Sequence, residues 1–572
     1  MAGLYGLLRP DTTNDQLLPP IFAAGIPGND VRKLSENGLL AGIAAEPTFT
    51  KERVLETRDD VTIGFYGFIF ESATDRVDRL FDSYKTGNTA FIHSLDGCFN
   101  GFIHDAPGKK LILFTDHLAT RPLYYGCDPA KRTLAFSGDA NHAAALLRVS
   151  GLPLTLNIEA LTCLLTIGYL YDDQTPVNQV RKIPFGTILE FNLDDFTIAT
   201  TRYREFRKIA VPQNMDACIQ SIDTMLVNSV RKVWDKDREY GLSHTALLSG
   251  GLDSRVNVLL ADELGYKPVT TFTFSQSGSS DEYIAGKISQ SKGFGHRFIP
   301  LDSGSYLHHN IKTYVAANDG LVTYNAAAHQ YASMMPQIHP RNGILHSGQI
   351  GDAVFGSLTL RNVSVPSQIL KKGYIHEFGI TETLGIYKRV ADRYRIDNNF
   401  ERFGYEQHIM NGTFNGDRMM LHHVEPLSPF YDRRLLEFCY SLPDRFKYDQ
   451  AIYLKWMKRY HPQIAEFPWA KTGIRPHNAL MNRTAGFLQK VNRYARKRLG
   501  LKHDNMNPFD LWYRENPELK KTLLAEYHAH EHLITDPRLR EALDYCVRKD
   551  RAQHLMNAVT VVLAADLYLN GQ

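Results

Sequence analysis

The chain has 572 residues, 43% of them hydrophobic and 22% charged, and a formal net charge of +3. This length exceeds what one hydrophobic core usually serves, so we expect two large domains, and the near-neutral charge argues against a nucleic-acid partner. Six scattered cysteines without a CxxC pair predict reduced thiols and a cytoplasmic protein, and neither a leader pattern nor an apolar run of membrane-spanning length is present.

The first part of the chain shows the pattern of β-strands. Short apolar runs recur between turn signals, at residues 61–70, 101–105, 110–114, 133–137 and 186–192. Several of them alternate between apolar and polar residues, as half-buried strands do. We therefore expect a β-rich first domain over residues 1–208.

From residue 209 onward, helices and strands alternate. Residues 214–235 have a helical period, and short β runs follow at 245–249, 269–275 and 343–347, each ending in a glycine or polar turn. This order predicts a parallel sheet with crossover helices, in which ligands bind beyond the carboxyl ends of the strands. Beyond about residue 370 the pattern is mostly helical, so the second domain is predicted to span residues 209–572 with a helical C-terminal part.

The most specific motif is the run Ser249-Gly250-Gly251-Leu252-Asp253-Ser254, at the end of the first of these strands. The two glycines allow backbone N–H groups to approach an anion, and the helix that is expected to start at Asp253 directs its positive end toward the same anion. The Asp253 carboxylate suits Mg²⁺ bound to a phosphate. Since the lysine of a Walker-type loop is missing, the motif predicts a cradle for the pyrophosphate of ATP.

The motif matches the SGGxDS loop of PP-loop enzymes, and the chain resembles the asparagine synthetase superfamily over essentially its full length. Residues 271–275 resemble the segment that binds adenine there, 347–356 resemble SG[E/D]GxDExFGG, and 429–432 resemble PFLD. Residues 468–473 resemble the segment with a lysine that contacts pyrophosphate and the tetrahedral intermediate. The resemblance implies ATP and Mg²⁺ as cofactors, with Asp253 and Asp352 as metal ligands and Lys471 as a catalytic residue. It implies an ATP site formed by Leu248, Ser249, Gly250, Gly251, Asp253, Ser254, Phe274, Ser347 and Gly348.

The N-terminal half resembles the glutaminase domain of the same family. Residues 115–125, 136–139 and 183–187 are similar to its RDxxGxxPLYY, FxSE and LPPG(T/H) segments. The resemblance implies an α/β protein with two parts: an N-terminal αββα sandwich like that of N-terminal-nucleophile hydrolases, and a C-terminal parallel sheet of the PP-loop ATPase type.

The residues of glutamine hydrolysis differ from the family pattern. Ala2 stands where the family has its nucleophilic cysteine, a change that engineering alone would explain. Engineering would not explain Tyr66, which replaces the oxyanion-hole asparagine, or the missing substrate-binding arginine near residues 40–43. We therefore expect no glutaminase activity, and Cys98 is interpreted as a structural thiol.

The synthetase half departs from the family at Gln349, where asparagine synthetases carry an acidic residue. Related enzymes with an inactive glutaminase half also vary there; β-lactam synthetase has a tyrosine and lasso peptide cyclases a histidine. A neutral amide is no general base, so Gln349 is predicted to orient an amine or an acyl-adenylate. The proton of the amine would then be accepted by solvent, by the leaving phosphate, or by a group such as His346 or His422.

Two further clusters favour plain interpretations. His528 and His532 have the i,i+4 spacing of a metal pair, but a solvated helix face is the preferred interpretation because no third ligand is evident. A basic run of Arg493, Arg496, Lys497 and Arg498 is also interpreted as a solvated face, with binding of an acidic substrate or carrier as the alternative.

The leading functional prediction is an ATP-dependent amide-forming ligase that acts on a small-molecule or peptide carboxylate and on an amine from a source other than glutamine. Specialised-metabolite, peptide or surface-polysaccharide biosynthesis would be its setting. One alternative is amidation of the asparagine synthetase type with free ammonia or a partner glutaminase, and another is an ATP-binding scaffold without chemistry. A homodimer is possible, and no membrane partner is expected. The sequence does not identify the carboxylate or the amine.

Overall fold

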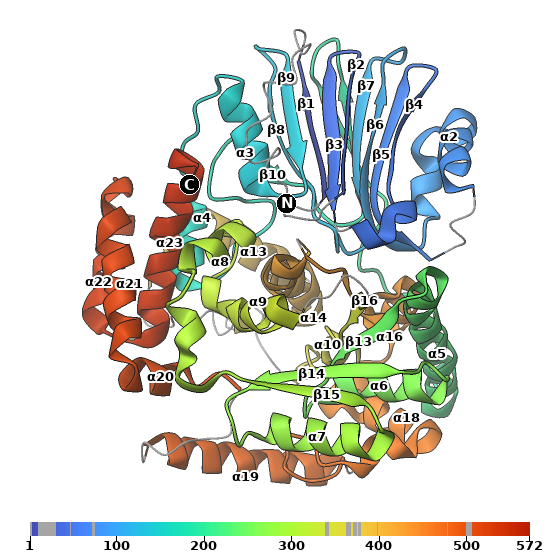
Figure 1. Ribbon diagram of the computed structural model, residues 1–572, viewed down its shortest axis with the longest axis vertical. Coiled ribbons are helices and arrows are strands. Elements are labelled where there is room, and N and C mark those ends of the chain that lie inside the picture. Colours follow the sequence, from blue (N-terminus) through green and yellow to red (C-terminus); the bar gives the residue numbers. More distant parts are fainter. Residues whose placement is uncertain are drawn as a thin grey trace.

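The structure is a computed structural model that describes residues 3–9, 30–45, 47–70, 75–337, 342–361, 368–369, 375, 379–396, 399–421, 423–476, 479–498 and 506–571. It is a mixed α/β protein in which two antiparallel sheets lie above a parallel sheet, with helices along one side and below (Figure 1).

The N-terminal half contains two six-stranded antiparallel sheets. The strands of the first, in spatial order, are β10 (Arg181–Lys182), β8 (Tyr124–Asp128), β9 (Thr133–Ser137), β1 (Gly3–Leu8), β3 (Leu39–Ala45) and β2 (Asp30–Glu36). Those of the second are β12 (Ile198–Arg202), β11 (Thr187–Asn192), β7 (Lys110–Thr115), β6 (Gly97–Asp105), β5 (Val61–Ile69) and β4 (Val54–Arg58).

Helices cover both outer faces of this sandwich. Because side chains alternate along a strand, Ile63 and Phe65 of β5 pack toward α2 (Arg76–Gly87), whereas Tyr66 packs into the core between the sheets. The other sheet is covered by α3 (Ala140–Val149) and α4 (Ile158–Thr166). The predicted αββα sandwich is confirmed.

The C-terminal half is built on a five-stranded parallel sheet, also as predicted. Its strands, in spatial order, are β15 (Gly295–Pro300), β14 (Val269–Ser275), β13 (Ser243–Leu247), β16 (Asn342–His346) and β17 (Pro426–Leu427). The strand order reverses direction between β13 and β16, so crossovers leave this pair toward opposite edges and open a crevice at its carboxyl end.

Helices pack on this sheet and extend beyond it. Those next to the sheet are α5 (Met215–Tyr240), α6 (Leu252–Glu263), α7 (Ser280–Lys292), α16 (Arg433–Ser441) and α18 (Ala451–Tyr460). The longer elements farther out are α9 (Ala328–Met334), α13 (Gly385–Arg395), the π-helix η7 (Gly404–Thr413), α19 (Ala479–Arg498), α21 (Pro517–His530), α22 (Pro537–Lys549) and α23 (Ala552–Asn570). In the described part of the chain, no helix combines the length and apolar character that crossing a bilayer requires.

Buried charges connect the two halves. The guanidinium of Arg418 donates to Asp139 Oδ1 at 2.5 Å and to Asp319 Oδ2 at 2.5 Å, and all three side chains are buried. Lys182, from the sandwich, donates to Met410 O and to Asn411 Oδ1 at 2.7 and 2.8 Å. Such charges are expensive to bury unless paired, so these contacts favour one relative placement of the halves. The exact boundary at residue 208 stays a prediction.

One histidine ties three helices of the C-terminal half together. His461 follows α18, and its Nε2 lies 2.8 Å from Asp223 Oδ1 of α5 while its Nδ1 lies 2.7 Å from Glu263 Oε2 of α6. Burial acts to lower the pKa of His461, but the two carboxylates outweigh it, so the net pKa is raised.

This arrangement predicts a pH-dependent contribution to stability. Because the folded pKa of His461 exceeds its unfolded value of about 6.5, the stabilisation is complete below that pH and is lost as pH rises through the folded pKa. We expect His461→Gln to lower the melting temperature more at about pH 6 than at about pH 9. The exposed His528 on α21 provides the control, His528→Gln, which should show no such difference. Equal losses for His461→Gln at both pH values would contradict the assignment.

Candidate active site at the crevice of the parallel sheet

The loops after β13 and β16 meet where the strand order reverses. The first loop carries Ser249 to Ser254 and the second carries Ser347 to Asp352. A Cβ on Gly348 would lie only 2.2 Å from Ser254 N and 2.4 Å from Asp253 C, so only glycine permits this contact. The structure therefore brings together the two motifs that the sequence placed almost 100 residues apart.

The carboxylates of Asp253 and Asp352 face this contact. The backbone N–H of Asp352 donates to Asp253 Oδ2 at 2.8 Å, while Asp253 Oδ1 is buried, and a hydrogen bond with the buried Tyr453 hydroxyl acts to lower the pKa of this carboxyl. Burial raises the pKa of Asp253 well above its ordinary value, and the charge of Asp352 raises it further. A divalent cation would reverse this penalty, because both carboxylates would then be stabilised as anions. The donor set therefore fits the predicted Mg²⁺.

Backbone strain occurs in the second loop at Ile350. This buried residue has φ of 61°, which is rare for a β-branched side chain. The turn that it forms lets the short helix α10 (Gly351–Val354) begin directly after it, with Asp352 in its first turn. The strain lies next to the two carboxylates, at the kind of place where strained residues gather.

Hydroxyl groups form hydrogen bonds within the glycine turn. Ser249 Oγ and Ser254 Oγ lie 3.0 Å apart, and Ser249 Oγ also accepts from Gly251 N–H at 3.2 Å. Helix α6 begins at Leu252, with Gly251 as its N-cap, one residue earlier than expected. Gly250 N–H donates to Asp281 Oδ1 at 2.8 Å, so a phosphate oxygen could replace a carboxylate oxygen there.

Arg255 fixes the segment that carries Lys471. This fully buried guanidinium donates to four carbonyl oxygens, at 2.5–3.2 Å, and burial lowers its pKa to about 10. The acceptors are Gly250, Ile464, Phe467 and Pro468. Ala470 N–H also donates to Gly250 O at 3.1 Å, which places the exposed Lys471 close enough for its charge to lower the pKa of Asp253. No local pattern in the sequence indicated this role of Arg255.

The segment assigned to adenine lies on the neighbouring strand. Thr273 Oγ1 donates to Leu248 O at 2.6 Å, and Leu248 N–H donates to Phe272 O at 2.9 Å. Phe274 is partly buried, and its ring centroid lies 5.3 Å from that of His329. Leu248 and Phe274 are thus near the carboxyl ends of adjacent strands, and their contact with adenine stays a prediction.

Gln349 has a carboxylate partner that sequence reasoning missed. Its Nε2 donates to Asp417 Oδ2 at 2.6 Å, and Asp417 lies at the end of α15 (Phe414–Asp417), directly after the π-helix η7. Burial raises the pKa of Asp417 to about 7, while the hydrogen bond from Gln349 lowers it somewhat. A carboxyl group with this pKa exchanges protons readily at neutral pH, which the Gln349 amide does not.

Comparisons with known proteins agree with this geometry. The family model described as asparagine synthase matches residues 221–463, and that described as glutamine amidotransferase domain matches residues 64–204. The first match contains both loops of the crevice, and the second contains most of the sandwich. The chain belongs to the asparagine synthetase superfamily.

Two curated relatives of this chain carry the name asparagine synthetase. A probable glutamine-hydrolyzing asparagine synthetase of Acanthamoeba polyphaga mimivirus is 26% identical over 348 residues, which cover 57% of this chain and 58% of that protein. Glutamine-hydrolyzing asparagine synthetase 2 of Bacillus subtilis (strain 168) is 22% identical over 453 residues, covering 68% of this chain and 56% of that protein. The chain thus spans somewhat more than half the length of these curated relatives.

Among solved structures, a glutamine phosphoribosylpyrophosphate amidotransferase from B. subtilis aligns at a TM-score of 0.24 and 10% identity. The alignment covers 52% of this chain and 65% of that one. A likeness this weak carries no structural argument.

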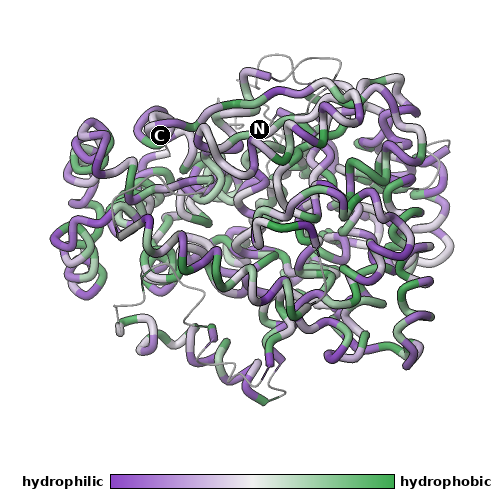
Figure 2. Tube along the Cα trace, turned by 90° about the horizontal axis from the view of Figure 1, so that it is seen from below, coloured by the Kyte–Doolittle hydropathy of each residue, from purple (hydrophilic) through white to green (hydrophobic). Residues whose placement is uncertain are grey.

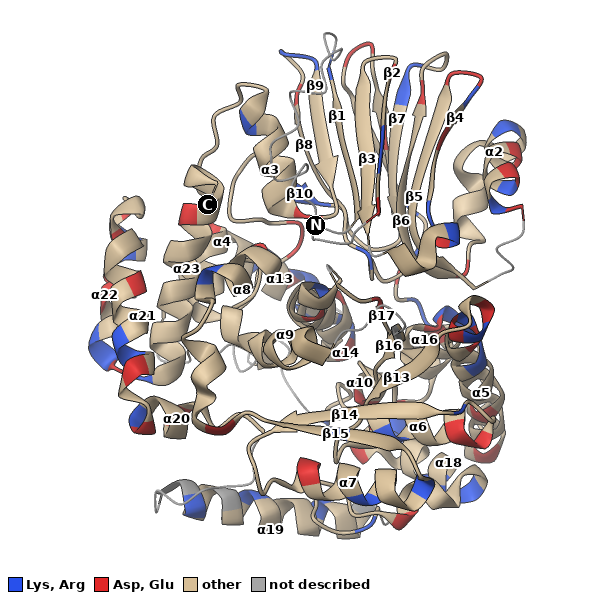
Figure 3. Cartoon of the chain, viewed as in Figure 1, with Lys and Arg blue, Asp and Glu red and all other residues tan. Residues whose placement is uncertain are grey.

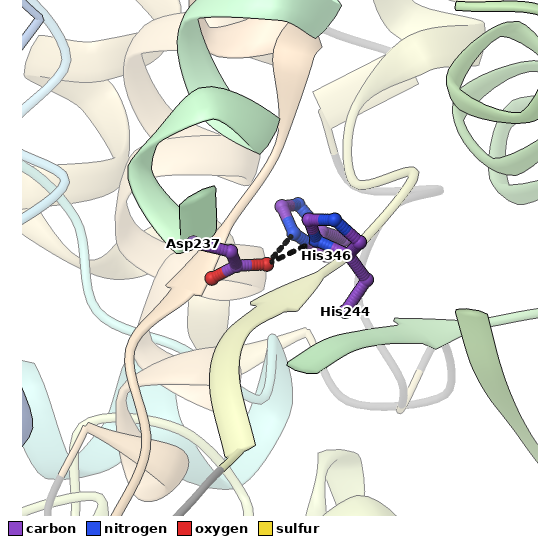
Figure 4. A group of neighbouring side chains, drawn as sticks. All are labelled: Asp237, His244 and His346. Atoms are coloured by element: carbon purple, nitrogen blue, oxygen red, sulfur yellow. Dashed lines mark hydrogen bonds and ion pairs between the residues drawn. The ribbon is translucent and has the colours of Figure 1, made fainter. Parts of the chain in front are cut away.

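The structure rules out His346 as a general base. Its Nε2 lies 2.7 Å from Asp237 Oδ2, to which His244 Nδ1 is also bound at 2.9 Å (Figure 4). The ring of His346 stacks on that of Trp234 with a centroid distance of 3.8 Å. All three members of the Asp237–His244–His346 cluster are buried, and burial lowers the pKa of His346. The imidazole nitrogens and the carboxylate oxygen of this cluster are hydrogen-bonded to one another, so the cluster stabilises the sheet below the crevice.

Other residues from the sequence analysis lie elsewhere. Ala2 and His422 are outside the described residues. His528 interacts with Glu531 at 3.1 Å, and α21 ends at His530, so His528 and His532 do not share a helix face. Burial raises the pKa of Cys98 to about 12, which suits a structural thiol.

A cavity of about 400 Å³ lies between the two halves of the protein, away from the crevice of the parallel sheet. It is lined by side chains of both signs, including Lys182, Arg202, Asp172 and Glu406. Burial lowers the pKa of Lys182 to about 7. None of the predicted ATP-site residues lines this cavity.

The close contact at Gly348 predicts that adding one methyl group there, as in Gly348→Ala, strongly affects stability and ATP binding. Gly348→Ala should force the two loops apart, destabilise the fold by about 1–3 kcal/mol and abolish the thermal shift caused by ATP with Mg²⁺. The control is Gly286→Ala in α7, where an added Cβ would meet nothing within 4 Å. It should keep the shift and gain about 0.5–1 kcal/mol from helix propensity. An unchanged ligand shift in Gly348→Ala would show that this contact does not form the ATP site.

Proposed function

We propose that this protein is an ATP-dependent ligase that forms an amide from a carboxylate and an amine through an acyl-adenylate. The observation that carries the proposal is the contact of Asp253 with Asp352 at the glycine turn, together with Lys471 on the adjacent segment. A binding scaffold would need neither a buried carboxyl whose pKa is raised by burial and by a second carboxylate nor a lysine close enough to lower that pKa.

ATP is assigned to the crevice between β13 and β16. The turn at Gly250 and Gly251 and the N-terminus of α6 would bind its pyrophosphate portion. Asp253 and Asp352 would hold Mg²⁺, which when bound supplies positive charge against the phosphate oxygens. Lys471 would stabilise negative charge on the leaving pyrophosphate and on the later tetrahedral intermediate.

The reaction then has two balanced steps. First, a carboxylate oxygen of the substrate bonds to the α-phosphorus of ATP, and the bond from that phosphorus to pyrophosphate breaks. Second, the amine nitrogen bonds to the acyl carbon, the bond from that carbon to AMP breaks, and the amine loses a proton. Asp417 is the proposed acceptor of that proton, with Gln349 orienting its carboxylate through the 2.6 Å hydrogen bond.

The amine is proposed not to arise from glutamine in the sandwich. Tyr66, at the position of the oxyanion-hole asparagine, donates its hydroxyl to Glu425 Oε1 at 2.9 Å, and Arg121 donates to Glu425 Oε2 at 2.7 Å. All three side chains are buried, so a carboxylate from the synthetase half already engages both polar groups. This favours an amine substrate over ammonia from glutamine; free ammonia or a partner glutaminase is the second candidate. The carboxylate is proposed to be a small molecule or peptide.

The metal site provides the first test of this proposal. Asp253→Asn and Asp352→Asn should each lower substrate-dependent exchange of labelled pyrophosphate into ATP by on the order of 100-fold or more, because each removes charge that a hard cation requires. Asp78→Asn, which changes an exposed carboxylate on α2, is the control and should exchange normally. Normal exchange in either site variant would overturn the assigned ATP site.

The proposed base provides a second test. Asp417→Asn should leave pyrophosphate exchange intact and slow amide formation by about 10²–10⁴-fold, the usual contribution of a general base. In the parent, kcat/KM for the amine should fall as pH drops below about 7, because protonated Asp417 accepts no proton, and this dependence should vanish in the variant. Asp417→Glu should recover part of the activity. Equal loss of both steps would place Asp417 in the ATP site instead.

A further inference from the structure

Helix α19 directs its apolar face away from the protein. Four large apolar residues, at positions i, i+7, i+8 and i+11, lie on one side of the helix and are 49–73% exposed. They are Leu480, Phe487, Leu488 and Val491. An amphipathic helix of a globular protein normally buries its apolar side, whereas α19 exposes it.

The opposite side of α19 packs on the turn that carries Lys471. Asn482 is buried, and a Cβ on Gly486 would lie 3.9 Å from Thr472 Cγ2 and 4.0 Å from Lys471 O. Gln489 lies near Gly473, since a Cβ on that glycine would be 3.7 Å from Gln489 Oε1. Asn482, Gly486 and Gln489 thus face the body, and the apolar residues of the helix point outward.

The charge of α19 limits what can cover it. The sequence 479–498 contains six Lys or Arg residues and no Asp or Glu, and Figure 3 shows blue without red along the helix. Arg483 and Lys490 lie along one edge of the apolar face, and Arg483 Nε also lies 3.8 Å from Asp449 Oδ1. A second copy of this chain would bring the same six positive charges against them, so self-association through this face is unfavourable.

The position of α19 favours a broad, soft surface over a protein groove. The helix runs along the lower edge of the molecule beneath α7 (Figure 1), and the view from below shows hydrophobic and hydrophilic residues alternating along it (Figure 2). A single 20-residue helix at an edge is a convex ridge. A lipid interface accepts such a ridge without a preformed groove, and the long basic side chains reach headgroups beside it.

We infer that α19 is an interfacial helix that docks the protein on an anionic lipid surface, with Leu480, Phe487, Leu488 and Val491 inserted and with Arg483 and Lys490 directed to headgroup phosphates. This departs from the sequence-based expectation of no membrane partner and from the interpretation of the basic run as a solvated face. It does not depend on the ligase proposal, since it requires no substrate.

Vesicle co-sedimentation of the full-length protein tests the inference. The parent should bind vesicles of equal parts phosphatidylglycerol and phosphatidylcholine at least tenfold more tightly than vesicles of phosphatidylcholine alone, and added salt should weaken the binding. Phe487→Ser with Leu488→Ser should lose at least tenfold, because the inserted side chains are removed. The control Ile396→Ser changes a residue that is 89% exposed at the end of α13 and should bind like the parent.

A second variant separates charge from folding effects. Lys490→Glu leaves the apolar face intact and should also lose tenfold or more on the anionic vesicles, with an unchanged melting temperature. Equal binding by the parent and the Phe487/Leu488 variant would overturn the inference. So would an absence of vesicle binding, or a concentration-dependent dimer that the Phe487/Leu488 substitutions abolish, since α19 would then cover a protein partner.

Discussion

The contact between the loops after β13 and β16 is the constraint on which the rest of the site depends. Gly348 has no room for a side chain because the backbone of Asp253 and Ser254 occupies that space. The same contact brings Asp352 N–H to Asp253 Oδ2 and leaves the second oxygen of Asp253 buried. Fold topology supplies this proximity, because the strand order reverses at this pair of strands.

Buried cations position the surrounding segments. Arg255 binds four carbonyl oxygens and so fixes the segment before Lys471 relative to the glycine turn. Arg418, with Asp139 and Asp319, connects the synthetase half to the sandwich, and it is adjacent in sequence to Asp417. Removing one partner of such a cluster leaves a buried charge uncompensated, at a cost of about 3–5 kcal/mol. These clusters give the proposed base a defined position although it lies on a short helix.

Polar groups of the sandwich have a structural role at the interface between the halves. Tyr66 and Arg121 bind Glu425, which precedes β17 of the other half, so these polar groups stabilise an interface between the halves. Under the proposed function, in which the sandwich hydrolyses no glutamine, this interface is a physical reason for the chain to keep it. Under this view the sandwich supports the ATP-binding half, and its polar pocket is part of the fold.

Much of the architecture followed from sequence periodicity and from motifs. The runs at 133–137 and 269–275 coincide with β9 and β14, and the glycine turn lies at a strand end as expected. The edge strands β2 and β12 went unrecognised, because their exposed residues leave little apolar pattern. The sequence alone determined the fold class, and its local motifs predicted the ATP cradle and the pair of metal carboxylates, which stay predictions. Only the tertiary structure decided that Asp417 meets Gln349, that Arg255 holds the Lys471 segment, that His346 is buried, and which way α19 faces. These depend on contacts between residues far apart in the chain, and no local pattern records which distant side chain fills a given space.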